Sequence, residues 1–286
     1  MGFKEELVGV IELSSEELDK IPKGFQRIGD IVIVDLSRFD DSRKVEIGEG
    51  ILKVFPYIKT VCSKEGPIGG EFREPSVKVV AGLEDTVVTH VESGIKYRFD
   101  VCKIMFAKGN MVERVRIPKL VKDGEVIVDM FAGIGYFSLG IGKLARPEKV
   151  YAIELNPVSF GFLEENVGLN KISDRVEVVN GDNREVIDGL VANGVRADRV
   201  VMGYLPPPKE FLPWAFKIVK DNGVIHYEDL VNVDDVENEV ERIVNEVREV
   251  ANGCGKDVEL VSDRKIKSYG PKVGHWVFDI RVVGKV

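Results

Sequence analysis

Cysteine is scarce in this chain, and long apolar runs are missing. Its 286 residues include three cysteines, Cys62, Cys102 and Cys254, which are scattered and form no C-x-x-C pair. This number and spacing predict neither a disulfide framework nor a zinc site. No stretch approaches the roughly 18–20 consecutive apolar residues of a membrane span, and the start Met-Gly-Phe-Lys-Glu-Glu is unlike a signal peptide. We therefore expect a cytoplasmic protein with no membrane association and no bound metal.

Net positive charge is also missing, because the chain carries 40 basic and 48 acidic residues and a formal net charge of −8 at pH 7. This argues against a nonspecific polyanion binder, but the charge is uneven. Residues 98–122 contain seven basic residues against two acidic ones, and residues 264–286 contain six against one. We expect these two basic stretches to hold phosphates of a nucleic acid. The alternative is that they are solvated faces of strands and linkers.

Two phosphate-binding fingerprints are absent from the turn around which the chain is organised. Residues 126–135 read Val-Ile-Val-Asp-Met-Phe-Ala-Gly-Ile-Gly, an apolar strand that ends in Asp129 and leads into a small-residue turn. The glycines do not follow G-x-G-x-x-G, and no Gly-Lys-Ser/Thr of a P-loop is present. We predict a buried strand, a tight turn that a ligand can approach closely, and a helix over residues 136–144.

The chain divides into two parts by its patterns. Residues 1–100 hold short strand-like segments and a helix-like segment at 42–55, which predict a small α+β domain. From residue 126 onward strand and helix patterns alternate, which is typical of a parallel α/β sheet. We expect strands at 126–129, 149–154, 175–180, 197–202 and 223–227, a long helix at 233–250 and a hairpin of 258–269 with 275–283. The predicted domains are 1–100 and 101–286, and the second opens with a basic linker.

The predicted strands end in polar side chains that suit one nucleoside. Asp129 closes the first strand, Glu154 closes the second, and Asp182 and Asn183 follow the third. The carboxyl ends of parallel strands meet at one edge of a sheet, so these groups are expected to lie together. Glu154 can accept both ribose hydroxyls, and Asp182 and Asn183 can bind the adenine amino group. This predicts an adenosyl ligand, and the missing phosphate cradle favours S-adenosylmethionine over NAD.

Several segments together resemble one family. They are Asp129-Met-Phe-Ala-Gly-Ile-Gly, Ala152-Ile-Glu, Gly181-Asp-Asn-Arg, Met202-Gly-Tyr and the run from Lys103 to Arg116. From about residue 27 to the C-terminus the chain is similar to the archaeal wybutosine-synthesising protein 2 family. These tRNA 4-demethylwyosine aminocarboxypropyltransferases are related to the tRNA guanine-37 N1-methyltransferases. The resemblance implies an α/β class I methyltransferase (Rossmann-like) fold with a smaller N-terminal α+β domain, residues 1–100, that has a role in tRNA binding. It also implies that the following residues bind S-adenosylmethionine: Ala107, Arg114, Asp129, Phe131, Gly133, Glu154, Asp182, Asn183 and Gly203.

The resemblance implies a reaction as well. Methyltransferase relatives carry an arginine at the position of Gly109 and Asn-Leu-Pro where this chain has Gly203-Tyr-Leu-Pro. Loss of both favours transfer of the 3-amino-3-carboxypropyl group of S-adenosylmethionine to 4-demethylwyosine at position 37 of tRNA-Phe, with release of methylthioadenosine. This is a step of wybutosine biosynthesis. Two alternatives stay open: methylation of guanine-37 at N1 or of a wyosine-type base, and a module that binds an adenosyl ligand or RNA without turnover.

Roles for single residues follow from the resemblance and the chemistry. At Ala107 only the backbone can contact the ligand, and Arg114 is the candidate for the carboxylate of the methionine arm, with a phosphate contact or surface charge as the alternative. Tyr204 can stack on the base or serve packing. No general base is identified; His226 and Glu228, near the end of the fifth strand, are candidates. The implied partner is the tRNA anticodon loop, with base 37 turned out of its stack, and no obligate protein partner is evident.

Overall fold

The computed structural model describes residues 2–70, 72–106 and 108–284. The chain forms two compact units, Met1–Phe106 and Ala107–Val286. The division lies six residues after the expected boundary at residue 100, since the segment after β6 (Ile95–Asp100) still packs in the first unit. The ring of Phe106 stacks on Phe99 with centroids 5.0 Å apart, and it contacts Tyr97 edge-on at 5.4 Å.

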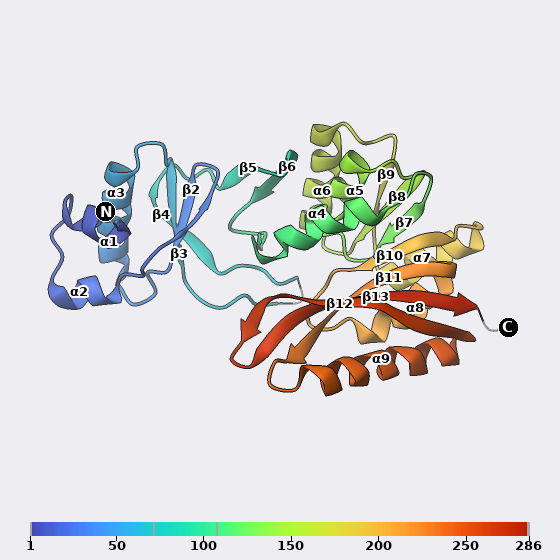
Figure 1. Cartoon of the computed structure of the whole chain (residues 1–286). Coiled ribbons are helices and arrows are strands. Elements are labelled where there is room, and N and C mark those ends of the chain that lie inside the picture. Colours follow the sequence, from blue (N-terminus) through green and yellow to red (C-terminus); the bar gives the residue numbers. More distant parts are fainter. Residues whose placement is uncertain (1, 71, 107, 285–286) are drawn as a thin grey trace. The chain divides into compact units, whose positions relative to one another are not determined.

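In the first unit a helix covers a mixed sheet (Figure 1). The sheet has the order β1-β2-β3-β4 and comprises β1 (Gln26–Ile28), β2 (Ile31–Val34), β3 (Thr60–Lys64) and β4 (Val77–Gly82). Helix α3 (Asp41–Val54) packs on it, and its Ile47 and Ile51 are fully buried against Val32 and Val61. The other elements are α1 (Phe3–Val8), α2 (Ser15–Lys20) and a hairpin of β5 (Val87–Glu92) with β6. This unit is therefore α+β.

The second unit contains a seven-stranded sheet in the order β12-β13-β11-β10-β7-β8-β9. Its parallel strands are β7 (Val126–Asp129), β8 (Lys149–Glu154), β9 (Val176–Asn180), β10 (Ala197–Met202) and β11 (Val219–Asn232). Between them lie α5 (Ser138–Leu144), α6 (Pro157–Asn170), α7 (Asn183–Ala192), the turn η2 (Lys209–Phe211) and α8 (Leu212–Ile218). The chain leaves β7 toward β8 and β9 and returns to β10 on the other side. Ligands of such sheets bind where the order reverses, which is here between β7 and β10.

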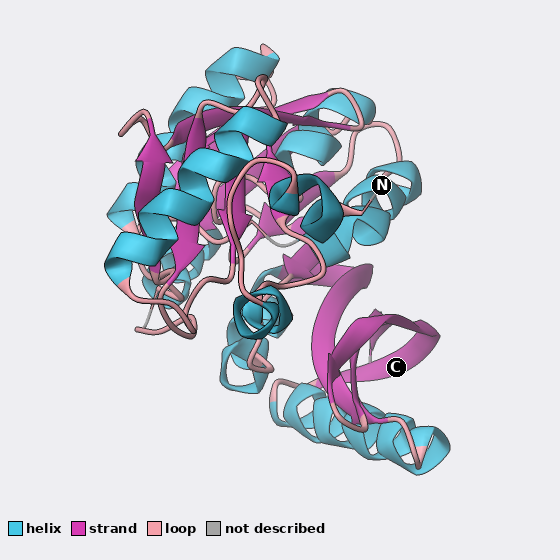
Figure 2. Cartoon of the chain, turned by 90° about the vertical axis from the view of Figure 1, so that its left-hand side faces the viewer, coloured by secondary structure: helices cyan, strands magenta, loops and turns pink. Residues whose placement is uncertain are grey.

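A long antiparallel ribbon completes this sheet. It is formed by β12 (Lys256–Gly270) and β13 (Val273–Gly284), and β13 also pairs with β11. Helix α9 (Val236–Gly253) lies along the ribbon, as Figures 1 and 2 show. Its apolar stripe, which includes Ile243, Val244 and Val247, is buried in the core of the unit. The α/β fold class expected from the sequence is confirmed.

The segment expected to be a basic linker forms a helix. Helix α4 (Met111–Leu120) follows the short turn η1 (Lys108–Asn110) and buries Glu113, Arg114 and Ile117. Because charged side chains share its buried face, the apolar periodicity that normally reveals a helix is weak here. Strand β11 also extends five residues past the expected Tyr227, since β13 pairs with it as far as Asn232.

Candidate active site

Asp129 closes β7 and is fully buried. Its carboxylate accepts hydrogen bonds from Ser138 Oγ at 2.5 Å and from Phe131 N at 3.4 Å. Burial raises the pKa of Asp129 to about 7, although the bonds from Ser138 and Phe131 oppose the rise. These bonds tie the end of β7 to the start of α5. Asp129 therefore shapes the glycine turn between them.

Glu154 closes β8 and holds the same turn from the other side. Its carboxylate accepts hydrogen bonds from Gly133 N at 2.7 Å and from Asn156 N at 2.8 Å. Each oxygen keeps a second lone pair, so two further hydroxyl donors can still be accepted. Burial raises the pKa of Glu154 against these donors. Gly133 has a φ of +58°, and a Cβ there would come within 2.6 Å of the Tyr136 ring, so only glycine suits this position.

Asp182 and Asn183 follow β9 and differ in how far their polar atoms are satisfied. Asp182 caps α7 and accepts hydrogen bonds from Arg184 with both carboxylate oxygens, which holds its pKa below the usual value. Asn183 is buried, and its Nδ2 donates to Met130 O at 3.0 Å. Its Oδ1 has no hydrogen-bond partner among the residues that the structure describes. An unpaired buried acceptor is unfavourable by about 1–3 kcal/mol, so a donor from a ligand would be stabilising there.

Arg114 reaches the glycine turn from α4. Its side chain is buried, and its guanidinium carbon lies 5.9 Å from the centroid of the Tyr136 ring. The Tyr136 ring in turn lies over Gly133. Arg114 is therefore not a surface charge, because it lies against Tyr136, whose ring covers the turn that Glu154 holds. Tyr136 could not be recognised as a site residue from the sequence, because an aromatic residue at a helix start carries no distinctive signal.

Aromatic rings from β7 and β10 meet at the reversal point of the sheet. Phe131 and Tyr204 stack with centroids 5.0 Å apart and planes at 17°, and Phe211 packs edge-on against Phe131 at 5.1 Å. Tyr204 is half-buried. A Cβ on Gly203 would come within 2.2 Å of the Phe137 ring, so glycine lets the end of β10 pass close to the start of α5. Phe131, Gly203 and Tyr204 thus lie together.

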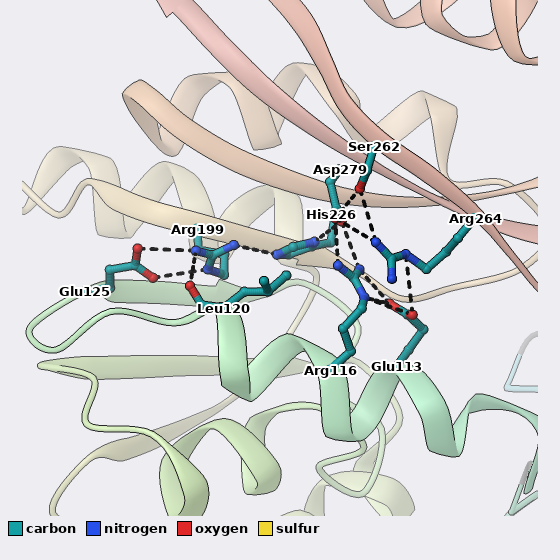
Figure 3. Close-up of polar contacts among 9 residues, drawn as sticks. All are labelled: Glu113, Arg116, Leu120, Glu125, Arg199, His226, Ser262, Arg264 and Asp279. Atoms are coloured by element: carbon teal, nitrogen blue, oxygen red, sulfur yellow. Dashed lines mark hydrogen bonds and ion pairs between the residues drawn. The ribbon is translucent and has the colours of Figure 1, made fainter.

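Neither ring nitrogen of His226 is available for chemistry. Its Nδ1 is 2.5 Å from Asp279 Oδ1 and its Nε2 is 2.8 Å from Arg199 Nη1 (Figure 3). A guanidinium only donates, so Nε2 accepts and Nδ1 carries the hydrogen toward Asp279. Burial lowers the pKa of His226, against the effect of Asp279. Both nitrogens are engaged, so the geometry corrects the expectation that His226 could act as a base.

His226 belongs to a buried charge cluster that links α4 to the sheet. The cluster comprises Glu113, Arg116, Glu125, Arg199, His226, Ser262, Arg264 and Asp279 (Figure 3). Arg116 donates to Asp279 at 2.7 Å and to Glu113 at 2.8 Å. Burial by itself raises the pKa of Asp279, but hydrogen bonds from His226 and Arg116 hold it far below its usual range. Arg116 is therefore not available to bind a phosphate, as was expected for the basic residues of 98–122. Lys119 and Lys122 of the same stretch are exposed.

Ala107, the remaining expected binding residue, lies outside the described residues. Within residues 2–70, 72–106 and 108–284, no three His, Cys, Asp or Glu side chains are arranged to hold a metal ion. No helix in the described part of the chain has the length and apolar character needed to cross a membrane.

Residues 88–261 match the TRM5/TYW2 methyltransferase domain, and residues 4–86 match the TYW2 N-terminal domain. The chain belongs to the TRM5/TYW2 family. The resemblance that the strand-end and turn motifs suggested is therefore confirmed, as is the class I methyltransferase fold.

TRM5/TYW2 relatives include enzymes of two kinds. The tRNA(Phe) (4-demethylwyosine(37)-C(7)) aminocarboxypropyltransferase of Pyrococcus horikoshii is 42% identical over 271 residues, covering 95% of this chain and 93% of the relative. The tRNA (guanine(37)-N(1))-methyltransferase Trm5b of Pyrococcus abyssi is 35% identical, over 96% of this chain and 79% of the relative. The crystal structure of P. horikoshii TYW2 in complex with MeSAdo superposes with a TM-score of 0.83 at 38% identity, covering 99% of this chain and 100% of that chain.

Proposed function

We propose that this TRM5/TYW2 member transfers the 3-amino-3-carboxypropyl group of S-adenosylmethionine to carbon 7 of 4-demethylwyosine at position 37 of tRNA-Phe. The observation that carries the proposal is the 42% identity, along 95% of the chain, with an aminocarboxypropyltransferase of that specificity. The crystal structure of a TYW2 with MeSAdo supports it, because methylthioadenosine is what remains of the donor after such a transfer. Glycine at positions 109 and 203 agrees with this branch of the family.

The residues at the carboxyl edge fit the adenosyl part of the donor. Glu154 keeps lone pairs for the two ribose hydroxyls while it holds Gly133. The unpaired Oδ1 of Asn183 suits the adenine amino group as a hydrogen-bond donor. Asp182 is already bound by Arg184, so we assign it a smaller share of the binding, through its remaining lone pairs.

The methionine arm of the donor supplies an electrophilic γ-carbon next to the sulfonium. We assign its carboxylate to Arg114, whose buried guanidinium beside Tyr136 is close to the turn and always positively charged. Which carbon of the sulfonium reacts depends on placement, so the role of Arg114 is to hold the arm where the γ-carbon faces the base.

Tyr204 is suited to receive the target base. It is half-buried, and its ring is backed by Phe131, which Phe211 braces from the side. Stacking of a nucleobase on an aromatic side chain contributes about 1–3 kcal/mol. The Tyr204 ring, at the point where the strand order reverses, is therefore suited as a stacking platform for a base turned out of the anticodon loop.

The tRNA itself is assigned to the first unit and to exposed lysines of the second. Lys119 and Lys122 lie at the C-terminal end of α4 and beyond it, and both are exposed. Such lysines can neutralise phosphates without reading sequence. Since tRNA is the substrate and the aminocarboxypropyltransferase relative is archaeal, we infer an archaeal enzyme that works in the cytoplasm on the anticodon loop without an obligate protein partner.

Product analysis tests this function. The protein is incubated with tRNA-Phe carrying 4-demethylwyosine and with S-adenosylmethionine labelled either in the carboxyl group or in the methyl group. We expect methylthioadenosine as the small product and carboxyl label on the tRNA. S-adenosylhomocysteine with methyl label on the tRNA would instead establish methylation. Methylation is the second candidate function because the chain is 35% identical to Trm5b.

A further inference from the structure

Glu228 and His275 form a buried pair that the proposed function does not yet use. His275 Nε2 lies 2.9 Å from Glu228 Oε2, and the two residues are 1% and 3% exposed. A carboxylate oxygen accepts, so Nε2 carries the hydrogen of this bond, and in the neutral ring Nδ1 is then an acceptor. This Nδ1 is buried and has no hydrogen-bond partner within the described part of the chain. The arrangement is a histidine oriented by a carboxylate, with its second nitrogen open for a proton.

His226 differs from His275 in the hydrogen bonding of its ring nitrogens. It is equally buried, yet both ring nitrogens have partners, in Asp279 and Arg199. A buried acceptor without a donor is unfavourable by about 1–3 kcal/mol. Such a group in a native protein calls for an explanation, and a role in chemistry is one. His275 meets this condition and His226 does not.

The strand register locates the pair at the edge where the other site residues lie. Met202 of β10 pairs with Tyr227 of β11, so Glu228 is level with Gly203. His275 pairs with Leu230, two residues or about 7 Å further along β11. β11 is the direct neighbour of β10, which carries Tyr204 at its end. The pair therefore lies on the two strands that follow β10 in the sheet order, level with the end of β10 and just beyond it.

The pair also shares its face of the sheet with α4. Side chains alternate along a strand, so Glu228 points to the same face as His226, and His275 to the same face as Asp279. On that face Arg116 of α4 binds Asp279. Gly109 of η1 lies close to Lys267, because a Cβ on Gly109 would come within 2.4 Å of the Lys267 side chain. Lys267 is the cross-strand neighbour of His275. The helix that carries Arg114 thus runs from the charge cluster toward Glu228 and His275.

We propose that His275 Nδ1 accepts the proton that carbon 7 of the target base loses during transfer. This rests on the proposed function. Carbon 7 forms a bond to the γ-carbon of the donor while the γ-carbon–sulfur bond breaks, and the sulfur keeps the electron pair as a neutral thioether. The base then returns to its aromatic form by releasing the carbon 7 proton to Nδ1. Glu228 fixes the tautomer of His275 and stabilises the imidazolium that results.

A deuterium isotope effect separates this role from a structural one. Single-turnover rates are compared for tRNA-Phe whose 4-demethylwyosine carries hydrogen or deuterium at carbon 7. In the wild type, proton loss is fast and the rates are expected to be equal. In His275→Gln the rate should fall about 100-fold, in the range that a positioned base contributes, and the deuterated substrate should react several-fold more slowly still. Glu228→Gln should show the same isotope effect with a smaller loss of rate.

His226→Gln is the matched control, since it removes a histidine of equal burial from the same face of the sheet. It is expected to lower stability without producing an isotope effect. The affinities of His275→Gln and Glu228→Gln for S-adenosylmethionine and tRNA should stay near those of the wild type. Unchanged turnover in His275→Gln, or slow turnover with equal rates for both isotopes in both variants, would overturn the proposal. A wild type that yields no methylthioadenosine would instead contradict the proposed function.

The tautomer of His275 supplies a readout that needs no turnover. The chain has three histidines, so ¹⁵N spectra of histidine-labelled protein are simple to assign with the variants. We expect the spectrum of a neutral ring protonated at Nε2 for His275 and at Nδ1 for His226. A hydrogen on Nδ1 of His275 would exclude it as proton acceptor, even if the variants proved too unstable for kinetics.

Discussion

Two groups of buried polar residues in the second unit differ in what they leave unpaired. In the charge cluster, His226 and Asp279 are bound on every side by Arg116, Arg199 and Ser262. At the carboxyl edge, by contrast, Asn183 Oδ1 and His275 Nδ1 are buried without partners among the described residues. A satisfied group contributes to the fold, whereas an unsatisfied one gains most from a ligand. The remaining hydrogen-bonding capacity distinguishes His226 and Asp279 from Asn183 and His275. Within the charge cluster, Arg264 Nε is also without a hydrogen-bond partner among the described residues.

The largest effect should come from breaking the charge cluster. Asp279→Ala removes the acceptor that His226 and Arg116 share and leaves Arg116 with Glu113 alone. Loss of one partner of a buried pair destabilises by about 3–5 kcal/mol. The measurement is the free energy of unfolding in urea. Asp234→Ala is the control, because its pair with Lys272 is exposed and should contribute only about 0–1 kcal/mol. Equal losses in the two variants would mean that the cluster does not hold the fold.

At the carboxyl edge the loss should appear in ligand binding. Glu154→Ala removes the acceptor for the ribose hydroxyls and the support of Gly133, so we expect affinity for S-adenosylmethionine to fall about 100-fold, as for two charge-assisted hydrogen bonds. Glu154→Gln keeps one acceptor oxygen and should lose less. Asp182→Ala should also weaken binding, but less, since Arg184 already holds that carboxylate. Calorimetric affinities that are unchanged in both alanine variants would refute the pocket.

Asp129, at the carboxyl edge, should make the stability of the protein depend on pH. Its carboxyl titrates near 3.9 when unfolded and about 7 when folded, so between these values the folded protein holds a proton that the unfolded chain has lost. Stability therefore falls as pH rises through this window, by about 1.5 kcal/mol between pH 5.5 and pH 7 from this group alone. Asp129→Asn should remove that part of the slope. Identical slopes for ligand-free wild type and variant in urea unfolding would show that Asp129 is ionised throughout.

The smallest effect concerns the exposed lysines. Reversing Lys119 and Lys122 to glutamate should weaken tRNA binding and lower the slope of log affinity against log salt by about 2, one unit for each phosphate that a lysine no longer neutralises. Lys217→Glu, on α8 and outside both basic stretches, serves as control and should leave the slope unchanged. If the double variant binds tRNA like the wild type at every salt concentration, the stretch has no role in recognition.

The sequence allowed the sheet, its strand ends and its ligand class to be predicted, because those features are local. Asp129, Glu154 and Asn183 each follow an apolar run, and parallel strands bring such ends together. Helix α4 was not predicted, since Glu113 and Arg114 occupy positions where apolar residues normally reveal a buried face. The partner of Arg116 is Asp279, 163 residues away, and no spacing rule reports such a pair. The partners of His226 and His275 are also remote in the sequence, 27 to 53 residues away, so the difference between these two histidines could not be predicted.

The position of β13 has a consequence for how the chain is made. β13 follows β12 in the sequence but lies between β12 and β11 in the sheet. During synthesis β11, α9 and β12 emerge first, and until β13 inserts, β11 presents an unpaired edge to the surroundings. Arg116 and His226 also lack their acceptor Asp279 until β13 has been synthesised. Chaperone protection during translation should therefore matter most in the interval before β13 leaves the ribosome, when this edge is open to pairing with other chains.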